Sequence, residues 1–306
     1  MLAHPITGLV AATHTPFHAD GSLNLAVVEK QAAHLQHTGI STVFIGGTTG
    51  ESHSLSLAER QALTQRWMEV TRGGSLKVVV HVGANCLGDV AALAAQAQAL
   101  GADAISALAP SYFKPRTAAA LVDCCAQITA AAPDLPFFLY DVPSFTGVSL
   151  SMPEFLTLGA ERLPTLAGIK FTNPDGTMFQ QCLHHGDRAF CILWGNDECL
   201  LAGLALGATG AVGSTYNFAA PVYQRIIRAF ENNDLATARA EQRRSVELVA
   251  RLASVGYMAA AKTVMKLLGV DVGPARLPHS NLDPAQEKAL HADLDKMGMM
   301  GAEFRL

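Results

Sequence analysis

Short runs of β-type residues alternate with longer stretches of helical apolar spacing along most of the chain, and eight such pairs can be counted. The strand candidates span residues 8–12, 42–45, 78–81, 104–108, 137–140, 166–170, 191–194 and 211–213. The helical candidates span residues 25–37, 57–71, 87–100, 118–131, 152–160, 176–185, 198–206 and 220–232. This alternation predicts an α/β protein with a parallel sheet, and eight units favour a closed (β/α)₈ TIM barrel over the alternative, a doubly wound open sheet.

The strand pattern stops after residue 233. Helical spacing continues at residues 235–252, 258–268 and 284–297. We therefore expect a catalytic barrel domain over residues 1–233, followed by a C-terminal helical extension over residues 234–306 that packs on the barrel or builds an oligomer contact. Arg276 lies in the irregular, proline-containing connection before the last helix, and we expect it to be structural. With 306 residues and 50% hydrophobic content, the chain can bury a core of this size.

Charge and hydropathy restrict the partners of the protein. A net charge of -4 offers no basic surface to nucleic acid, so a small molecule is the expected partner. The longest apolar stretches are interrupted before they reach spanning length, and residues 1–5 have no basic region leading into an apolar one. We expect no membrane contact and a soluble, cytoplasmic protein.

The cysteines and histidines show no metal-binding spacing. There is no Cys-x-x-Cys pair and no His-Glu-x-x-His arrangement, so a metal site has little support and reduced, buried thiols are expected. His81, which ends the third predicted strand, is expected to pack inside the barrel rather than to act as a base. The six cysteines are Cys86, Cys124, Cys125, Cys182, Cys191 and Cys199.

Lys170 stands in an unusual place, at the end of the apolar run 166–170. A lysine at a strand end is usually a surface residue. Here the apolar neighbours disfavour the ammonium form and favour a neutral amine, which can attack a carbonyl group. Lys170 is therefore a candidate nucleophile.

A glycine-rich segment, Gly-Gly-Thr-Thr-Gly-Glu at residues 46–51, follows the second predicted strand. In a barrel, the loops after the strands form the face that carries the chemistry. The glycines allow backbone N–H groups to approach an anion, and the threonines add hydroxyl donors. Because the segment lacks the lysine of a phosphate loop, a carboxylate is a better candidate ligand than a nucleotide. The alternative is a glycine turn into a threonine-capped helix.

Three further strand exits carry candidate site residues. Tyr140 closes the fifth strand, where a buried phenol can pass a proton, although a core tyrosine with a satisfied hydroxyl is the alternative. Asp197 and Glu198 follow the seventh strand at a helix start, where capping is the alternative to ligand binding. The glycine-rich exit of the eighth strand, residues 210–217, is suited to an anion or a polyol.

These motifs, taken in order, resemble the dihydrodipicolinate synthase and N-acetylneuraminate lyase superfamily over nearly the whole chain. The resemblance rests on Gly-Gly-Thr-Thr-Gly-Glu, on Tyr-x-x-Pro at residues 140–143 and on Gly-Ile-Lys-x-Thr at residues 168–172. Features of the lyase branch occur at residues 80–83, 195–198 and, above all, 210–217. Residues 109–115 and 273–278 look like the animal-type lyases in particular.

The resemblance implies a class I aldolase that forms a Schiff base with pyruvate and cleaves N-acetylneuraminate reversibly to N-acetylmannosamine and pyruvate, without metal or organic cofactor. It also implies a homotetramer. Lys170 matches the Schiff-base lysine, and Tyr140 matches the phenol that relays protons. Thr48 and Tyr112 match the hydroxyl chain beside it, with Tyr112 reaching in from a neighbouring subunit. Thr48 and Thr49 match hydroxyls that hold the pyruvate carboxylate. The positions implied to bind the sugar-derived part of the substrate are Thr172, Gly195, Asp197, Glu198, Gly213 and Ser214.

The sequence departs from the lyase pattern at Asp141, Ser144 and Phe145. In the synthase branch the position of Phe145 is an arginine that grips the carboxylate of the second substrate, so dihydrodipicolinate synthesis is disfavoured here. Lyases carry a smaller apolar residue at this position. An aldolase or dehydratase acting on another 2-keto-3-deoxy sugar acid therefore stays open as an alternative. A non-catalytic binding protein on the same scaffold is a rival of another class, against which intact Lys170 and Tyr140 argue.

Overall fold

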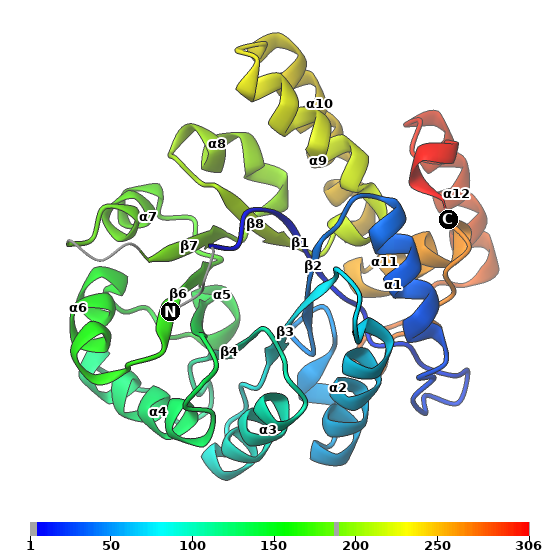
Figure 1. Cartoon of the computed structure of the whole chain (residues 1–306). Helices are drawn as coiled ribbons and strands as arrows, with labels where there is room; N and C mark the ends of the chain where they lie inside the picture. Colours follow the sequence, from blue (N-terminus) through cyan, green and yellow to red (C-terminus); the bar gives the residue numbers. More distant parts are fainter. Residues whose placement is uncertain (1–4, 187–189, 306) are drawn as a thin grey trace.

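The computed structural model describes residues 5–186 and 190–305, so most of the N-terminal segment considered above lies outside the described residues. Eight parallel strands form a closed barrel in which each strand pairs with the next and the last pairs with the first (Figure 1). The predicted (β/α)₈ barrel is confirmed. Its strands are β1 (Gly8–Ala12), β2 (Thr42–Ile45), β3 (Lys77–His81), β4 (Ala104–Leu108), β5 (Phe137–Asp141), β6 (Leu166–Phe171), β7 (Cys191–Trp194) and β8 (Gly210–Gly213).

Helices surround the barrel in the order that the alternation predicts (Figure 1). They are α1 (Val27–His37), α2 (Leu57–Thr71), α3 (Leu87–Ala99), α4 (Ala118–Ala131), α6 (Met152–Arg162), α7 (Gly176–Leu183), α8 (Leu200–Ala205) and α9 (Tyr216–Glu231). Short elements that the pattern does not predict are α5 (Pro143–Thr146) and the 3₁₀ turns η1 (Ser52–Ser54), η2 (Asp197–Cys199) and η3 (Ala302–Phe304). All but η3 lie in loops that follow strands.

Apolar side chains form two layers. The larger one fills the space between the strands and the surrounding helices, and the smaller one fills the barrel itself. This follows from the alternation of side chains along each strand, because successive residues point to opposite faces. Phe44, Phe138 and Tyr140 belong to the inner layer. Inward-pointing residues near the C-terminal ends of the strands therefore face the mouth of the barrel, where barrel enzymes place their active sites.

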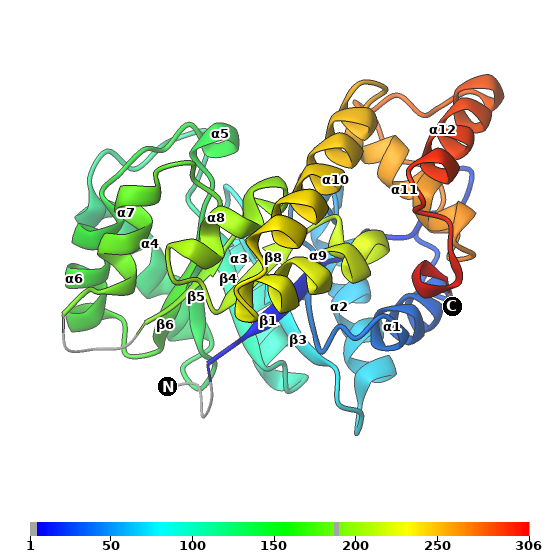
Figure 2. The ribbon, with the colours of Figure 1, turned by 90° about the horizontal axis from the view of Figure 1, so that it is seen from above.

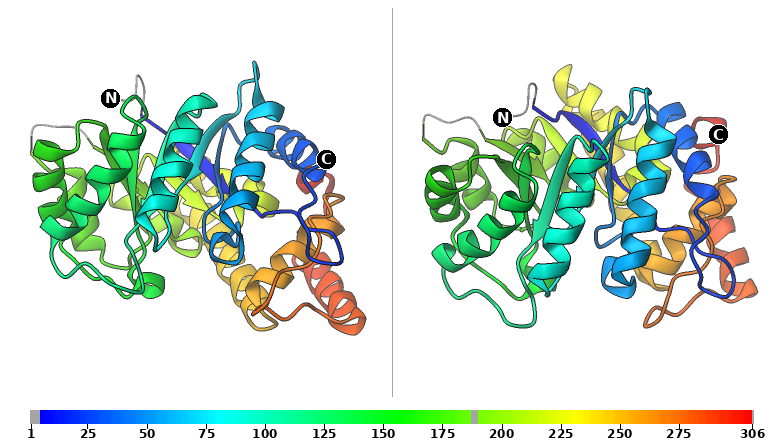
Figure 3. Two further views of the ribbon diagram at one scale, coloured as in Figure 1. Left: turned by 90° about the horizontal axis from the view of Figure 1, so that it is seen from below. Right: turned by 60° about the horizontal axis from the view of Figure 1, so that its bottom comes forward.

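Three helices follow the barrel and stand on one side of it: α10 (Leu235–Ala253), α11 (Tyr257–Leu267) and α12 (Pro284–Lys296). Figure 2 shows the barrel from the side, with α5 at the end where the strands finish and α10–α12 beside that end. In Figure 3, α11 and α12, orange to red, lie on the same side of the barrel as the blue helix α1. Within the described part of the chain, no helix is both long enough and apolar enough to cross a membrane.

The cysteines differ in part from the expectation. All six are free, and Cys125 and Cys182 are buried, which raises the pKa of the Cys182 thiol to about 12. Cys86 and Cys199, however, are exposed, so the prediction of buried thiols was wrong for these two. The reason is local: Cys86 precedes the first turn of α3 and Cys199 ends the short turn η2, and loop positions of this kind lie at the surface.

Candidate active site

Lys170 lies inside the barrel, with only 5% of its surface exposed. It stands opposite Tyr140 in the register of β5 and β6. Its Nζ lies 3.8 Å from the centre of the Tyr140 ring and 4.2 Å from that of Phe44. Among the described residues no carboxylate forms an ion pair with it. The amine is therefore held between two aromatic rings, where it faces a ligand without a competing anion.

The hydroxyl of Tyr140 points toward the loop after β2. Its oxygen lies 3.4 Å from Oγ1 of Thr48, which is half-buried. The two hydroxyls thus form a chain that begins beside Lys170. The alternative, a tyrosine whose hydroxyl is satisfied within the core, does not describe this residue, because the hydroxyl contacts a loop hydroxyl at the cavity.

The loop at residues 46–51 is a turn that Thr15, three residues beyond the end of β1, holds by a hydrogen bond. Gly46 adopts φ +65°, a conformation that favours glycine, and the Gly50 carbonyl accepts a 2.6 Å hydrogen bond from Thr15 Oγ1. The loop continues into η1 rather than into a helix, and α2 is capped by Ser56. The alternative of a threonine cap is therefore wrong, and both Thr48 and Thr49 line the cavity.

Asp197 is buried beside the end of β8. Its Oδ2 accepts hydrogen bonds from the Thr215 backbone N–H (2.9 Å) and the Thr215 hydroxyl (2.6 Å). Burial raises the pKa of Asp197 to about 6, and the hydrogen bonds from Thr215 oppose that rise. The residue that precedes η2, Asn196, makes no side-chain cap. Asp197 therefore joins two strand exits rather than capping a helix, while Glu198 is exposed at the rim of the same cavity.

Two glycines make room for these polar groups. A Cβ added to Gly213 would lie 2.2 Å from Oδ1 of Asp197. A Cβ added to Gly195 would lie 2.0 Å from Oγ1 of Thr172, a buried hydroxyl that has no hydrogen-bond partner among the described residues. The sequence predicts both glycines as site residues, and the geometry supplies the reason: neither position has space for a side chain.

Ser214 contacts Tyr257, a site residue that the sequence does not predict. Its Oγ lies 2.6 Å from the hydroxyl of Tyr257, the first residue of α11. Tyr257 lines the same cavity, and burial keeps the pKa of its phenol well above the ordinary value. A tyrosine that opens a helix in the C-terminal tail carries no local signal of this role, because the helix reaches the barrel only in the folded chain.

These residues enclose a cavity of about 610 Å³ at the ends of the strands. Ser144 and Phe145 also line it, whereas Asp141 is buried outside its wall and accepts a hydrogen bond from Asn173. Among the described residues that line the cavity, Lys170 is the only lysine or arginine. The predicted site residues that line it are Thr48, Thr49, Tyr140, Lys170, Thr172, Gly195, Asp197, Glu198, Gly213 and Ser214.

Tyr112 is the predicted site residue that a single chain does not bring to Lys170. Its side chain is 77% exposed and packs edge to face on Phe113, with the ring centres 5.0 Å apart. It lines a separate hollow with Lys114 and Gly147. This placement leaves the expected contribution from a neighbouring subunit as a prediction.

His81 is buried and Arg276 lies in the connection before α12, and neither lines the cavity, so their structural roles stay predictions. Neither ring nitrogen of His81 has a hydrogen-bond partner among the described residues, and burial holds its pKa well below the usual range. Arg276 binds both carboxylate oxygens of Glu59 and donates to the carbonyl of Gly21. The described residues contain no group of three or more His, Cys, Asp or Glu side chains arranged to hold a metal ion.

The model of the Dihydrodipicolinate synthetase family matches residues 5–297. The chain belongs to this family. Within the family, it is 39% identical over 277 residues to N-acetylneuraminate lyase of Mus musculus, which covers 89% of this chain and 87% of that protein.

Solved structures of the family agree with the fold. The N-acetylneuraminate lyase of Proteus mirabilis superposes with a TM-score of 0.94 at 37% identity, covering 97% of this chain and 100% of that one. A dihydrodipicolinate synthase from Cyanidioschyzon merolae superposes with a TM-score of 0.88 at 28% identity, covering 96% and 98% of the two chains. The family barrel is thus shared by both branches, and of these two structures the Proteus mirabilis lyase is the more similar in sequence and in fold.

Proposed function

We propose that the protein is a Schiff-base aldolase that cleaves N-acetylneuraminate reversibly to N-acetylmannosamine and pyruvate. The observation that carries the proposal is the placement of Lys170, whose amine lies between two aromatic rings inside a polar cavity. Relatives named N-acetylneuraminate lyase, which match most of the chain, support the choice of substrate.

The chemistry needs only groups that the chain supplies. Lys170 Nζ adds to the C2 carbonyl of the substrate, and loss of water leaves a protonated imine. When the adjacent C3–C4 bond breaks, its electron pair moves into the imine and forms an enamine, while the proton of the C4 hydroxyl passes to Tyr140. Protonation of the enamine at C3 and hydrolysis then release pyruvate and free Lys170. In this scheme Thr48 continues the proton path.

The remaining cavity residues divide between the two ends of the substrate. We assign the pyruvate carboxylate to Thr48 and Thr49, because the Thr48 hydroxyl lies beside that of Tyr140. The sugar-derived tail is assigned to the exits of β6, β7 and β8, whose carboxylates accept hydrogen bonds from a polyol and whose hydroxyls also donate them. The residues in the tail set are Thr172, Gly195, Asp197, Glu198, Gly213 and Ser214.

Assembly forms part of the proposal. Tyr112 and Phe113, two exposed aromatic residues that pack on each other, support a subunit interface at this surface, because exposed apolar patches mark interfaces. We propose a homotetramer in which Tyr112 completes the site of a neighbouring subunit. The cytoplasmic location stays a prediction.

A second candidate is supported by Phe145. Its side chain is 71% exposed at the cavity wall and cannot bind a second carboxylate, which argues against dihydrodipicolinate synthesis. The bulk of Phe145 at the wall favours, as the alternative, an aldolase or dehydratase for another 2-keto-3-deoxy sugar acid. Comparing pyruvate release from N-acetylneuraminate and from a panel of such acids distinguishes the two.

Borohydride trapping tests the mechanism. With pyruvate present, borohydride should reduce the imine and leave a three-carbon adduct on Lys170, which mass spectrometry of the digested protein locates. Lys262 is a matched control, because it is a second buried lysine whose ammonium is already paired. An adduct on another lysine, or none at all, contradicts the proposal. Lys170→Ala should remove both the adduct and turnover, since the nucleophile itself is lost.

A further inference from the structure

The last residue of the glycine-rich loop, Glu51, forms a fully buried ion pair with Lys262 on α11. Nζ of Lys262 lies 2.6 Å from Oε1 of Glu51, and the exposed fractions of the two side chains are 1% and 0%. Glu51 is held in a left-handed conformation, with φ +54°, which is uncommon for a residue other than glycine. A strained residue with a buried charge is costly, so the contacts around it fix its position.

The same cation binds two further segments. Lys262 donates hydrogen bonds to the carbonyls of Thr15, at 3.0 Å, and Pro274, at 2.8 Å. Its Nζ also lies 4.2 Å from the ring centre of Phe17. One ammonium on α11 therefore joins the exit of β1, the end of the glycine-rich loop and the connection that follows α11.

These contacts reach the two threonines by short paths. The backbone N–H of Glu51 donates to the carbonyl of Thr48 at 3.0 Å. The hydroxyl of Thr15, whose carbonyl accepts a hydrogen bond from Lys262, donates to the carbonyl of the neighbouring residue Gly50. The turn that presents Thr48 and Thr49 is thus attached on its C-terminal side, at Gly50 and Glu51, to Lys262 and to a residue that Lys262 binds.

We propose that Lys262 and Glu51 are positioning residues for the pyruvate half of the site, because their ion pair fixes the backbone that presents the hydroxyls of Thr48 and Thr49 to the substrate carboxylate. The inference rests on the proposed function, in which those hydroxyls bind pyruvate. A buried ion pair is weak evidence for stability, since desolvation offsets its attraction. A defined geometry of the loop is what this pair supplies.

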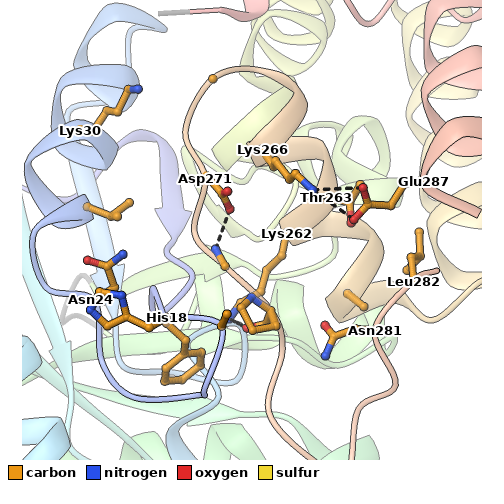
Figure 4. Close-up of a pocket in the computed structure, with 17 residues that line it drawn as sticks. His18, Asn24, Lys30, Lys262, Thr263, Lys266, Asp271, Asn281, Leu282 and Glu287 are labelled. Carbon is orange, nitrogen blue, oxygen red and sulfur yellow. Dashed lines mark hydrogen bonds and ion pairs between the residues drawn. The ribbon is translucent and has the colours of Figure 1, made fainter. Parts of the chain in front are cut away.

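The ion pair also separates two cavities. Glu51 lines the cavity of about 610 Å³ that holds Lys170, while Lys262 lines a second one of about 640 Å³ between α1 and the C-terminal helices. Figure 4 shows this second cavity, with Lys262 at its wall and a separate ion pair between Lys266 and Glu287. Loss of the Lys262 side chain would therefore remove a contact that holds the loop at residues 46–51 between the two cavities.

Steady-state kinetics in the direction of synthesis tests the inference. In Glu51→Gln and Lys262→Met, the KM for pyruvate should rise roughly tenfold, within what a small misplacement of binding groups costs, while the KM for N-acetylmannosamine stays within about twofold. Because both changes remove the same interaction, the double variant should resemble either single one. The double variant also removes the unpaired buried charge, so it can be measured if Lys262→Met does not fold.

The matched control is a partly exposed ion pair whose lysine lies on the same helix, α11, and whose glutamate lies on α12. Nζ of Lys266 lies 3.1 Å from Glu287, and both side chains are partly exposed. Lys266→Met and Glu287→Gln should leave both KM values at the wild-type level. A purely structural role of Lys262 and Glu51 predicts a smaller active fraction, which lowers kcat and leaves the KM for pyruvate unchanged.

Borohydride trapping at Lys170, measured against pyruvate concentration, distinguishes failure of the inference from failure of the function. If the wild type traps pyruvate and the variants require more pyruvate for half-maximal trapping, the inference holds. If the wild type and the variants reach half-maximal trapping at the same concentration, the inference is overturned and the aldolase proposal stands. If the wild type traps none, the proposed function fails, and the inference fails with it.

Discussion

Tyr140 has two separable parts at the centre of the site. Its ring lies 3.8 Å from Nζ of Lys170, and its hydroxyl lies 3.4 Å from Thr48 Oγ1. Replacing the residue by phenylalanine keeps the ring and removes only the hydroxyl.

Tyr140→Phe should therefore leave pyruvate trapping at Lys170 intact and slow cleavage by roughly 10²–10⁴, the usual range for a lost acid–base group. Single-turnover cleavage of N-acetylneuraminate measures the rate, and borohydride trapping measures imine formation. An unchanged cleavage rate would return Tyr140 to a packing role.

Asp197 gives a prediction on pH. Its pKa is raised from 3.8 to about 6 in the folded protein, so the folded state holds the proton more tightly than the unfolded state does. The resulting stability is present below pH 3.8 and is lost as the pH rises through about 6.

Asp197→Asn removes this titration and keeps an oxygen for Thr215. From about pH 4 to about pH 7, its unfolding free energy should rise relative to wild type by on the order of 3 kcal/mol, since one pKa unit corresponds to 1.36 kcal/mol. Urea unfolding at both pH values measures the difference. The exposed Asp134→Asn serves as control and should show the same difference at both. A constant difference for Asp197→Asn would rule out this account.

Single residues of the site can be predicted from the sequence when their neighbours in the chain make them unusual. Lys170 and Tyr140 end apolar strands, and that setting is visible in the chain. Glu51 and Tyr257 are different, because their roles depend on partners far away. For example, Glu51 Oε2 accepts a hydrogen bond from the backbone N–H of Arg276, which lies 225 residues further along the chain. No local pattern encodes such a contact.

Among the elements, β8 shows how a strand is adapted to the site. It ends in Gly213, against which the carboxylate of Asp197 lies. The carboxylate of Asp197 can occupy this place only because Gly213 has no side chain.

Gly213→Ala should displace Asp197 and lower stability by roughly 1–3 kcal/mol, as overpacking does. It should also lower kcat/KM for N-acetylneuraminate. The control is Gly88→Ala in α3, where an added Cβ would meet only Cys86 Sγ at 3.7 Å. That change should be neutral or stabilising by up to about 1 kcal/mol, since alanine favours a helix interior. Thermal unfolding and kinetics of both variants decide the matter, and equal behaviour would contradict the steric argument.

Strands are also the elements that the sequence predicts best. Each predicted range agrees with the structure to within one residue at either end, because β-branched and apolar runs flanked by polar residues leave little freedom. The short elements are missed. Helix α5, at Pro143–Thr146, is a single turn, too short to show helical periodicity.

At the scale of the whole molecule, the position of Tyr112 bears on the assembly of subunits. Tyr112 is exposed in the single chain, while the other predicted site residues line one cavity. If Tyr112 acts in the site of a neighbouring subunit, two inactive chains can restore each other.

Co-expressed Lys170→Ala and Tyr112→Phe chains should therefore regain lyase activity, because some sites combine an intact Lys170 with an intact Tyr112 from the partner. The control is co-expression of Lys170→Ala with Tyr140→Phe, which belong to the site of one chain and should not complement. Sedimentation velocity gives the mass of the assembly. Absence of complementation in a tetramer would place Tyr112 outside the reaction.

The pairing of β1 with β8 has a consequence for how the protein is made. Val10 in β1 pairs with Val212 in β8, so one edge of β1 stays unpaired until β8 has been synthesised. During translation a long segment thus leaves the ribosome with an unpaired strand edge, a feature that invites association with other chains. Lys262, which comes still later, then fastens α11 to the exit of β1 through the carbonyl of Thr15. The nascent chain is therefore expected to depend on chaperones until its final helices have been synthesised.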